Sequence, residues 1–208
     1  MLQFAQLKSF IRKSVDITDE DFQKIIPFFR FKKIKKHNDI STIGELCNDL
    51  IFINTGSLIS YSIDDQGKEH IIRFAFENEW IWVPVCFMKA VYSEFAIRTI
   101  EDTELLLLSY SLRENIFSVV PVMEKFFRKL ADDYIGQLMI HFTSIISDPA
   151  ETRYKKLIDV SPELFNKVPL NIIASFLCVT PQSLSRIRQN MFKNLKLNSG
   201  KLKQLKAC

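Results

Sequence analysis

Short apolar stretches alternate with turn residues along the chain between residues 31 and 111. These stretches read DLIFINTG, SLISYSID, EHIIRFAF, EWIWVPVCF, FAIRTI and ELLLLSY. Strands spaced at roughly 10 residues are typical of an antiparallel barrel or sandwich. The clearest hairpin is SLISYSIDDQGKEHIIRF, where Gly67 can adopt the positive φ of a tight turn.

Helical patterns flank this region on both sides. Residues 1–30 predict helices, with Asp16 or Thr18 as a cap. From about Pro121 to Asp148, apolar residues recur at spacings of three and four, which predicts a two-faced helix of about 25 residues. Its apolar positions include Phe127, Leu130, Tyr134, Leu138, Phe142 and Ile145. Such a helix can pair with a partner subunit along part of its length, or lie entirely within its own subunit.

The C-terminal segment predicts a helix over residues 150–165, then two short helices joined by a tight turn. Residues 178–180 interrupt the helical pattern, and Val179 is expected in the core that the two helices share. Thr180 can cap the second helix, and Pro181 suits its first position because no N–H is needed there. The expected inner positions are Leu170, Ile173, Ala174 and Leu177 in the first helix, and Leu184, Ile187 and Met191 in the second.

The second of these helices carries short polar and cationic side chains in its N-terminal half, as a DNA-reading helix does. Arg186 can form two hydrogen bonds with guanine, and Gln182 can pair with adenine. Thr180 and Ser183 can bind phosphate near the helix N-terminus. The expected DNA-binding residues are Thr180, Gln182, Ser183, Ser185, Arg186 and Gln189, with Arg188, Lys193 and Lys196 adding charge toward the DNA backbone. The alternative is an ordinary helical hairpin with a solvated basic face.

The distribution of charge sets the C-terminal segment apart from the rest of the chain. The formal net charge is +4, but residues 1–149 carry −4 and residues 150–208 carry +8. No acidic residue follows Glu163. A basic module attached to a mildly acidic one favours a polyanionic partner, and therefore favours DNA binding over the ordinary hairpin.

Several classes of protein are disfavoured by what the sequence lacks. The four cysteines, Cys47, Cys86, Cys178 and Cys208, are too far apart for a C-x-x-C motif, so we expect reduced thiols and no iron–sulfur cluster. Because there is no metal-ligand spacing, no P-loop and no Ser-His-Asp set, we expect no metal site and no enzyme activity. No apolar run reaches about 18 residues and no signal peptide is visible, so we expect a cytoplasmic protein without a membrane partner.

The chain resembles the Crp/Fnr superfamily of bacterial transcription regulators, in the divergent form common in Bacteroidetes-like genomes. The segment IASFLCVTPQSLSRIRQNM resembles the helix-turn-helix of that family, and FINTGSLISYSIDDQGKEHIIRFAFENEWI resembles its cyclic-nucleotide-binding β-roll. The resemblance implies an α+β fold with a β-roll sensor domain over residues 1–118, a dimerisation helix over 119–148 and a helix-turn-helix domain over 149–208. It also implies a homodimer that binds DNA at a palindromic site and regulates transcription.

Three positions depart from the family pattern in the DNA-binding domain. Pro181, Gln182 and Arg186 fall where the family contacts bases, but Pro181 cannot donate a hydrogen bond. Cys178 stands where the turn usually has glycine, although side chains disfavour positive φ. The segment after Leu195 is short for a full wing, so we expect a reduced wing. Its lysines Lys201, Lys203 and Lys206 can contact phosphates as a flexible tail. A ligand- or protein-binding scaffold without DNA binding is the alternative function.

The sensor region departs from the family pattern more strongly. The Gly-Glu and Arg-Ser/Thr pairs that cradle a cyclic phosphate are missing, and Glu94 would repel a phosphate. We therefore expect no cofactor, neither cyclic nucleotide nor iron–sulfur cluster nor haem, since the three histidines suit surface or turn positions. Trp80, Trp82, Arg98 and Tyr134 are predicted to line a pocket for an unknown, not necessarily polar, small-molecule effector. The alternative is that Trp80 and Trp82 only pack beneath the lip of the barrel.

Overall fold

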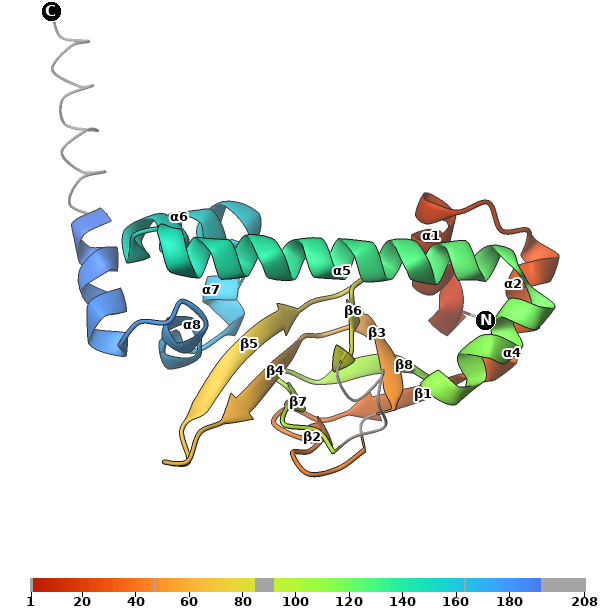
Figure 1. Ribbon diagram of the computed structural model, residues 1–208, viewed down its shortest axis with the longest axis horizontal. Helices are drawn as coiled ribbons and strands as arrows, with labels where there is room; N and C mark the ends of the chain where they lie inside the picture. Colours follow the sequence, from red (N-terminus) through yellow and green to blue (C-terminus); the bar gives the residue numbers. More distant parts are fainter. Residues whose placement is uncertain (1, 47, 85–91, 163, 192–208) are drawn as a thin grey trace, which may run out of the picture. The chain divides into compact units, whose positions relative to one another are not determined.

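The computed structural model describes residues 2–46, 48–84, 92–162 and 164–191, which form two compact units. The first unit is Met1–Ile140 and the second is His141–Cys208. Helix α5 (Val122–Ser147) begins in the first unit and ends in the second, as Figure 1 shows in green. No helix in the described ranges is both long and apolar enough to cross a membrane.

The N-terminal helices of the first unit follow the sequence pattern. They are η1 (Leu2–Phe4), α1 (Ala5–Ser14), α2 (Asp19–Ile25) and η2 (Ile26–Phe28). Thr18 caps α2, because its side-chain oxygen accepts a hydrogen bond from the Asp21 N–H at 3.1 Å. The acidic residues of the first turn stabilise α2, because their negative charges lie near the positive end of the helix dipole. Of the two predicted caps, Thr18 is therefore the one that forms.

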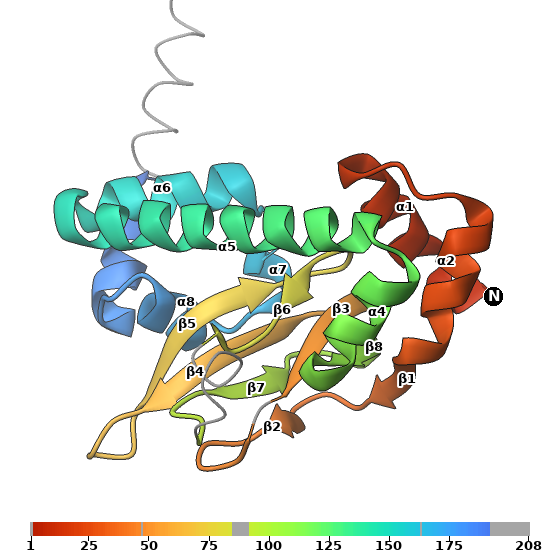
Figure 2. The same ribbon diagram turned by 45° about the vertical axis from the view of Figure 1, so that its right-hand side comes forward.

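Two antiparallel sheets of four strands make up the β-roll, with strand orders β1-β8-β3-β6 and β2-β7-β4-β5 (Figure 2). The strands are β1 (Phe29–Ile34), β2 (Asp39–Ser41), β3 (Asp49–Thr55), β4 (Leu58–Ile63), β5 (Glu69–Ala75), β6 (Trp80–Ile81), β7 (Ala96–Thr99) and β8 (Thr103–Ser109). The predicted hairpin is β4–β5, with Gly67 at a φ of 78°. In the predicted strand EWIWVPVCF, Trp80 and Ile81 pair with β3, and its last three residues lie outside the described part of the chain.

Strands β3 and β8 are apolar on both faces because each face packs against a different partner. Alternate residues fill the space between the two sheets, including Ile51, Ile53, Leu58, Ile97, Leu105 and Leu107. The other residues of these strands, such as Phe52 and Leu106, join a core with α1, α2 and α5. The run ELLLLSY is thus a strand buried on both sides.

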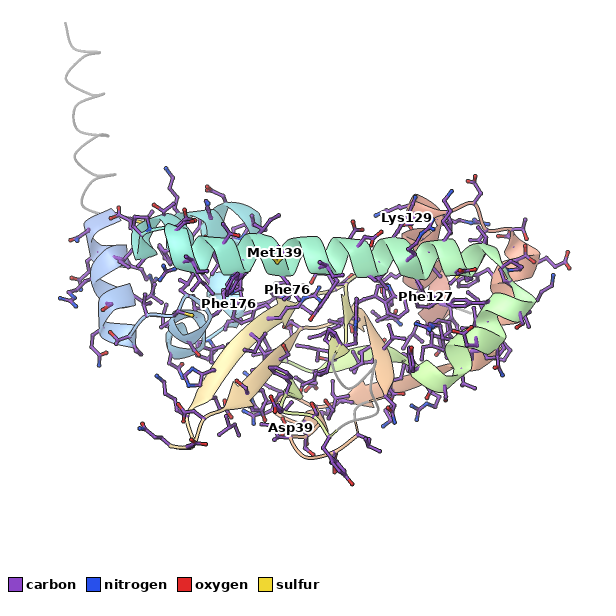
Figure 3. All side chains as sticks on the ribbon, in the orientation of Figure 1. Asp39, Phe76, Phe127, Lys129, Met139 and Phe176 are labelled. Carbon is purple, nitrogen blue, oxygen red and sulfur yellow. The ribbon has the colours of Figure 1, made fainter. Side chains whose placement is uncertain are left out.

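Trp80 lies at the centre of this second core. Its ring is 2% exposed and lies 5.4–6.3 Å from four phenylalanine rings, those of Phe29, Phe52, Phe126 and Phe127. Figure 3 labels Phe127 and Lys129 on α5, and the Lys129 ammonium donates to the Ser14 carbonyl oxygen of α1 at 2.7 Å. The chain reaches α5 through η3 (Tyr110–Leu112) and α4 (Arg113–Val119).

The apolar positions predicted on α5 divide between two environments. Phe127, Leu130, Tyr134 and Leu138 pack against the first unit's core. Phe142 does not continue that face, because 58% of its side chain is exposed. Of the two alternatives for this helix, an exposed Phe142 favours pairing along part of its length over burial entirely within its own subunit.

The second unit is helical throughout its described part. After the end of α5 come α6 (Ala150–Val160), α7 (Leu164–Lys167), α8 (Leu170–Phe176) and a helix over residues 181–191. The helix predicted over 150–165 ends early, at Val160. The residue before a proline disfavours helical angles, and Ser161, which precedes Pro162, has a ψ of 68°.

Candidate nucleic-acid interface

The turn between α8 and helix 181–191 is closed by backbone hydrogen bonds. The N–H of Cys178 donates to the Ser175 oxygen and the N–H of Val179 to the Ala174 oxygen, each at 3.0 Å. Cys178 has a φ of 52°, so the cysteine adopts the left-handed conformation of a position that usually holds glycine, although side chains disfavour it. This conformation reverses the chain within the few residues between the two helices.

The buried side of this helix pair consists of four of the predicted inner positions. Ile173, Ala174, Leu177 and Leu184 are each at most 3% exposed. The prediction was wrong for Leu170, which begins α8 and is 38% exposed. Val179, Ile187 and Met191 are half-buried, so they lie at the edge of this buried side.

The N-terminus of helix 181–191 is capped by Thr180. Its Oγ1 accepts a hydrogen bond from the Ser183 N–H at 3.1 Å and donates to Ser183 Oγ at 2.9 Å. Arg186 Nη2 donates to the same Ser183 oxygen at 3.4 Å. Thr180, Ser183 and Arg186 thus form a local chain of hydrogen bonds at the start of the helix.

The exposed side of helix 181–191 carries four of the residues predicted to bind DNA, Gln182, Ser185, Arg186 and Gln189. Their spacing places them on one face of the helix, opposite the buried Leu184. Thr180 is exposed at the cap, and Ser183 is half-buried between the two sides. The structure therefore brings the six predicted residues together on the first turns of a single helix.

Arg188 was predicted to add positive charge toward the DNA backbone, but its side chain is not fully exposed. It is half-buried, and its Nε atom is inaccessible to solvent. It lies beside Tyr154 of α6. Burial raises the pKa of Tyr154, and the positive charge of Arg188 lowers it by a smaller amount. Lys193 and Lys196 lie outside the described residues, as do the tail lysines Lys201, Lys203 and Lys206.

Sequence reasoning missed Arg153 of α6, which has the most hydrogen bonds of any side chain described in the second unit. Its Nε and Nη2 atoms donate to the Leu177 oxygen at 3.1 and 2.8 Å. Its Nη1 atom donates to the Asp148 oxygen at 2.7 Å and to the Ile145 oxygen at 3.4 Å. A signal was present in the sequence, because Ile145 and Leu177 each stand four residues before a proline.

The predicted effector residues do not all meet. Trp80, Trp82 and Tyr134 line a cleft of about 250 Å³ in the first unit. The Trp82 and Tyr134 rings lie 4.3 Å apart, and burial raises the pKa of Tyr134. Arg73 of β5, which the sequence did not single out, lies over the Tyr134 ring at 4.7 Å and lines the same cleft.

Arg98 does not line this cleft with the other three residues predicted for the pocket. On β7 its Nε bonds Asp39 at 3.0 Å and its Nη1 bonds Glu69 at 2.8 Å. The guanidinium also covers the ring of Tyr61 at 4.3 Å, and burial raises the pKa of that tyrosine to about 12. Arg98 therefore belongs to a surface cluster in the sheet β2-β7-β4-β5, where two carboxylates neutralise its charge.

An antiparallel β-roll, a long helix and a C-terminal helix-turn-helix unit together define the fold of the Crp/Fnr transcription regulators. FixK2 from Bradyrhizobium japonicum has this fold with a TM-score of 0.69 at 16% identity, covering 80% of this chain and 85% of that chain. The c-di-GMP responsive global regulator CLP from Xanthomonas campestris gives 0.68 at 14%, covering 85% and 93%. A putative Crp/Fnr-family regulator from Eubacterium rectale gives 0.69 at 16%, covering 93% and 89%.

At these identities the likeness is one of fold, and it confirms the predicted α+β architecture. No protein-family model matches the sequence, and no curated protein matches it. The structural neighbours of the chain are thus transcription regulators, which agrees with the resemblance seen in its motifs.

Proposed function

We propose that this protein is a transcription regulator that binds specific DNA sequences through helix 181–191. One observation carries the proposal: Gln182, Ser185, Arg186 and Gln189 share the exposed face of a capped helix. Short polar side chains and a guanidinium at the N-terminal half of such a helix can reach base edges in the major groove. The basic charge after Glu163 would strengthen the interaction with phosphates.

The proposed regulator acts as a homodimer through α5. Along the side of this helix that its own subunit leaves open, Ile135, Met139, Phe142 and Ile146 are each 57–69% exposed. They follow one another at spacings of four, three and four, which is the pattern of a coiled-coil seam. Isolated exposed apolar residues are common, but a regular stripe of large ones indicates a partner surface. Two copies joined along this stripe would present two reading helices to a palindromic site.

The cleft at Tyr134 is the proposed effector site. It combines the Trp82–Tyr134 ring pair, tilted by 33°, with the guanidinium of Arg73, so a small aromatic molecule could contact the rings and accept a hydrogen bond there. The neighbour CLP is described as c-di-GMP responsive, which is consistent with a small-molecule effector in this fold. Because α5 carries both Tyr134 and the exposed stripe, a ligand in the cleft would contact the same helix that joins the subunits.

The DNA-binding proposal is tested by selecting bound sequences from a random DNA pool and measuring affinity for the selected site against salt concentration. We expect an inverted repeat with half-sites about one helical turn apart and a steep salt dependence. Arg186→Ala should weaken specific binding by about 1–3 kcal/mol. Arg128→Ala removes the same charge from the exposed side of α5 in the first unit, and should leave that affinity unchanged.

Failure to select any motif, with and without candidate effectors, would contradict the proposal. So would equal losses in Arg186→Ala and Arg128→Ala, because the effect would then report net charge alone. In that case the alternative of a scaffold without DNA binding would be favoured.

A further inference from the structure

The side chain of Arg153 joins three helix ends in the second unit. Arg153 itself lies in the first turn of α6, and its acceptors are the carbonyl oxygens of Leu177, Ile145 and Asp148, at the ends of α8 and α5. A guanidinium has five N–H groups in one plane, and four donor–acceptor contacts are made here. A cation in the first turn of a helix opposes the helix dipole. The side chain gains instead from the negative C-terminal ends of two other helices.

Two of these carbonyl groups have no donor within their own helix, because α5 ends at Ser147 and α8 at Phe176, and the sequence offers no N–H at the next helical position either. In an α-helix the oxygen of residue i accepts from the N–H of residue i+4. For Ile145 that position is Pro149, and for Leu177 it is Pro181. Proline has no N–H, so both oxygens need another partner or remain unpaired at a helix end. Arg153 supplies donors to both.

The contact with Leu177 is the one that bears on the reading helix. Leu177 is followed by the left-handed Cys178, by Val179 and then by the cap Thr180. Any shift of the Leu177 peptide would therefore change the direction in which helix 181–191 leaves the turn. Arg153 ties that peptide to the last turn of α5 through the same rigid group.

We propose that Arg153 is a positioning residue that fixes the angle of helix 181–191 against the end of α5, and so sets specific DNA recognition without reading bases. The inference rests on the proposed DNA-binding function. A lysine would keep the charge, but a single ammonium cannot hold three carbonyl groups in one plane as the guanidinium does. Specific recognition needs a fixed angle, because base edges must be met within hydrogen-bond distance, whereas non-specific binding needs only positive charge.

The test compares Arg153→Lys with the unmodified chain in two DNA-binding measurements. We expect affinity for the selected site to fall about 10-fold, the size of a lost hydrogen bond to a charged group. Affinity for random-sequence DNA and its salt dependence should not change, since the charge is kept. Hydrogen exchange should quicken at the Cys178 and Val179 amides, while amides within helix 181–191 stay protected.

Two further variants separate positioning from charge. Arg153→Gln removes both the charge and the planar set of N–H donors. It should lower the ratio of specific to non-specific affinity at least as far as Arg153→Lys. Lys155→Gln removes an exposed charge from the same helix without touching a described carbonyl contact, and should leave that ratio unchanged. All variants are compared at a temperature where circular dichroism shows them folded.

Equal losses of specific and non-specific affinity in Arg153→Lys would show a merely structural role and overturn the proposal. If the unmodified chain selects no DNA sequence, the proposed function fails, but the exchange measurement still decides the role of Arg153. Unchanged exchange at Cys178 and Val179 would overturn the proposal by itself.

Discussion

The first and second units differ in what fixes their side chains. In the first, rings surround Trp80 on several sides and apolar residues fill both faces of β3 and β8. In the second, the described buried apolar residues are fewer: Tyr154, Leu164, Val168, Ile173, Ala174, Leu177 and Leu184. Helix ends there are joined by the guanidinium of Arg153. Apolar packing fixes a large unit, whereas a small helical unit also depends on directional hydrogen bonds at its ends.

The largest effect should come from removing the centre of the first unit's core. Trp80→Ala is expected to destabilise that unit by about 3–5 kcal/mol, because it leaves a large cavity among four rings. Calorimetry should show its transition at a much lower temperature. Tyr92→Ala, at a side chain that is 72% exposed, is the control and should change little. Similar shifts in the two variants would mean that the aromatic core is not what stabilises this unit.

In the second unit, Leu184→Ala should cost about 2–3 kcal/mol, since the side chain is fully buried but the smaller core can close around the cavity. Leu170→Ala deletes the same atoms from a 38% exposed position and should cost far less. Chemical denaturation of both variants gives the comparison. A larger loss for Leu170→Ala would contradict the packing described for the helix pair.

A smaller effect is expected at the cap of helix 181–191. Thr180→Ala removes the acceptor of the Ser183 N–H and should destabilise the helix by about 1 kcal/mol. Hydrogen exchange at the first amides of the helix would report this loss directly. Thr152→Ala, at an exposed threonine within α6, has no comparable cap to lose and should be nearly neutral.

The smallest effect concerns pH. His141 stacks on Phe176 of α8 with 4.2 Å between ring centroids, and burial, helped by the charge of Arg153, lowers the pKa of the histidine below 6.5. The unfolded chain therefore binds the proton more readily, so stability is complete above about pH 6.5 and falls as the pH drops below it. His141→Phe should remove that part of the acid sensitivity. An unchanged difference in melting temperature between pH 7 and pH 5 would contradict this assignment.

The elements that the sequence predicted well are those whose signals are local and periodic. Gly67 marks the β4–β5 hairpin, spacings of three and four mark α5, and Thr180 followed by Pro181 marks the start of helix 181–191. Each of these signals depends only on residues close together in the sequence, so it can be recognised without knowing the fold. The shared exposed face of Gln182, Ser185, Arg186 and Gln189 on helix 181–191 followed from the same periodicity.

The features that were missed depend on contacts between distant residues. Arg98 lies on a strand, where side chains alternate between faces, and only its partners Asp39 and Glu69 decide which way it points. Arg153 donates to carbonyl oxygens whose need for a donor the prolines indicate, but the sequence does not say which side chain supplies it. Phe142 fits the apolar period of α5, but period alone does not say how far along a helix the subunit's own core extends.

Helix α5 carries two apolar stripes that are locked together in phase. One stripe packs on the first unit's core and the other, from Ile135 to Ile146, is exposed. Each added residue advances a helix by about 100°, so one residue inserted after Leu138 would turn Met139 and all that follows out of line with Ile135. Four inserted residues would restore the line within about 40°. The length of this helix therefore sets the rotational alignment of its exposed stripe as well as the distance that the stripe spans.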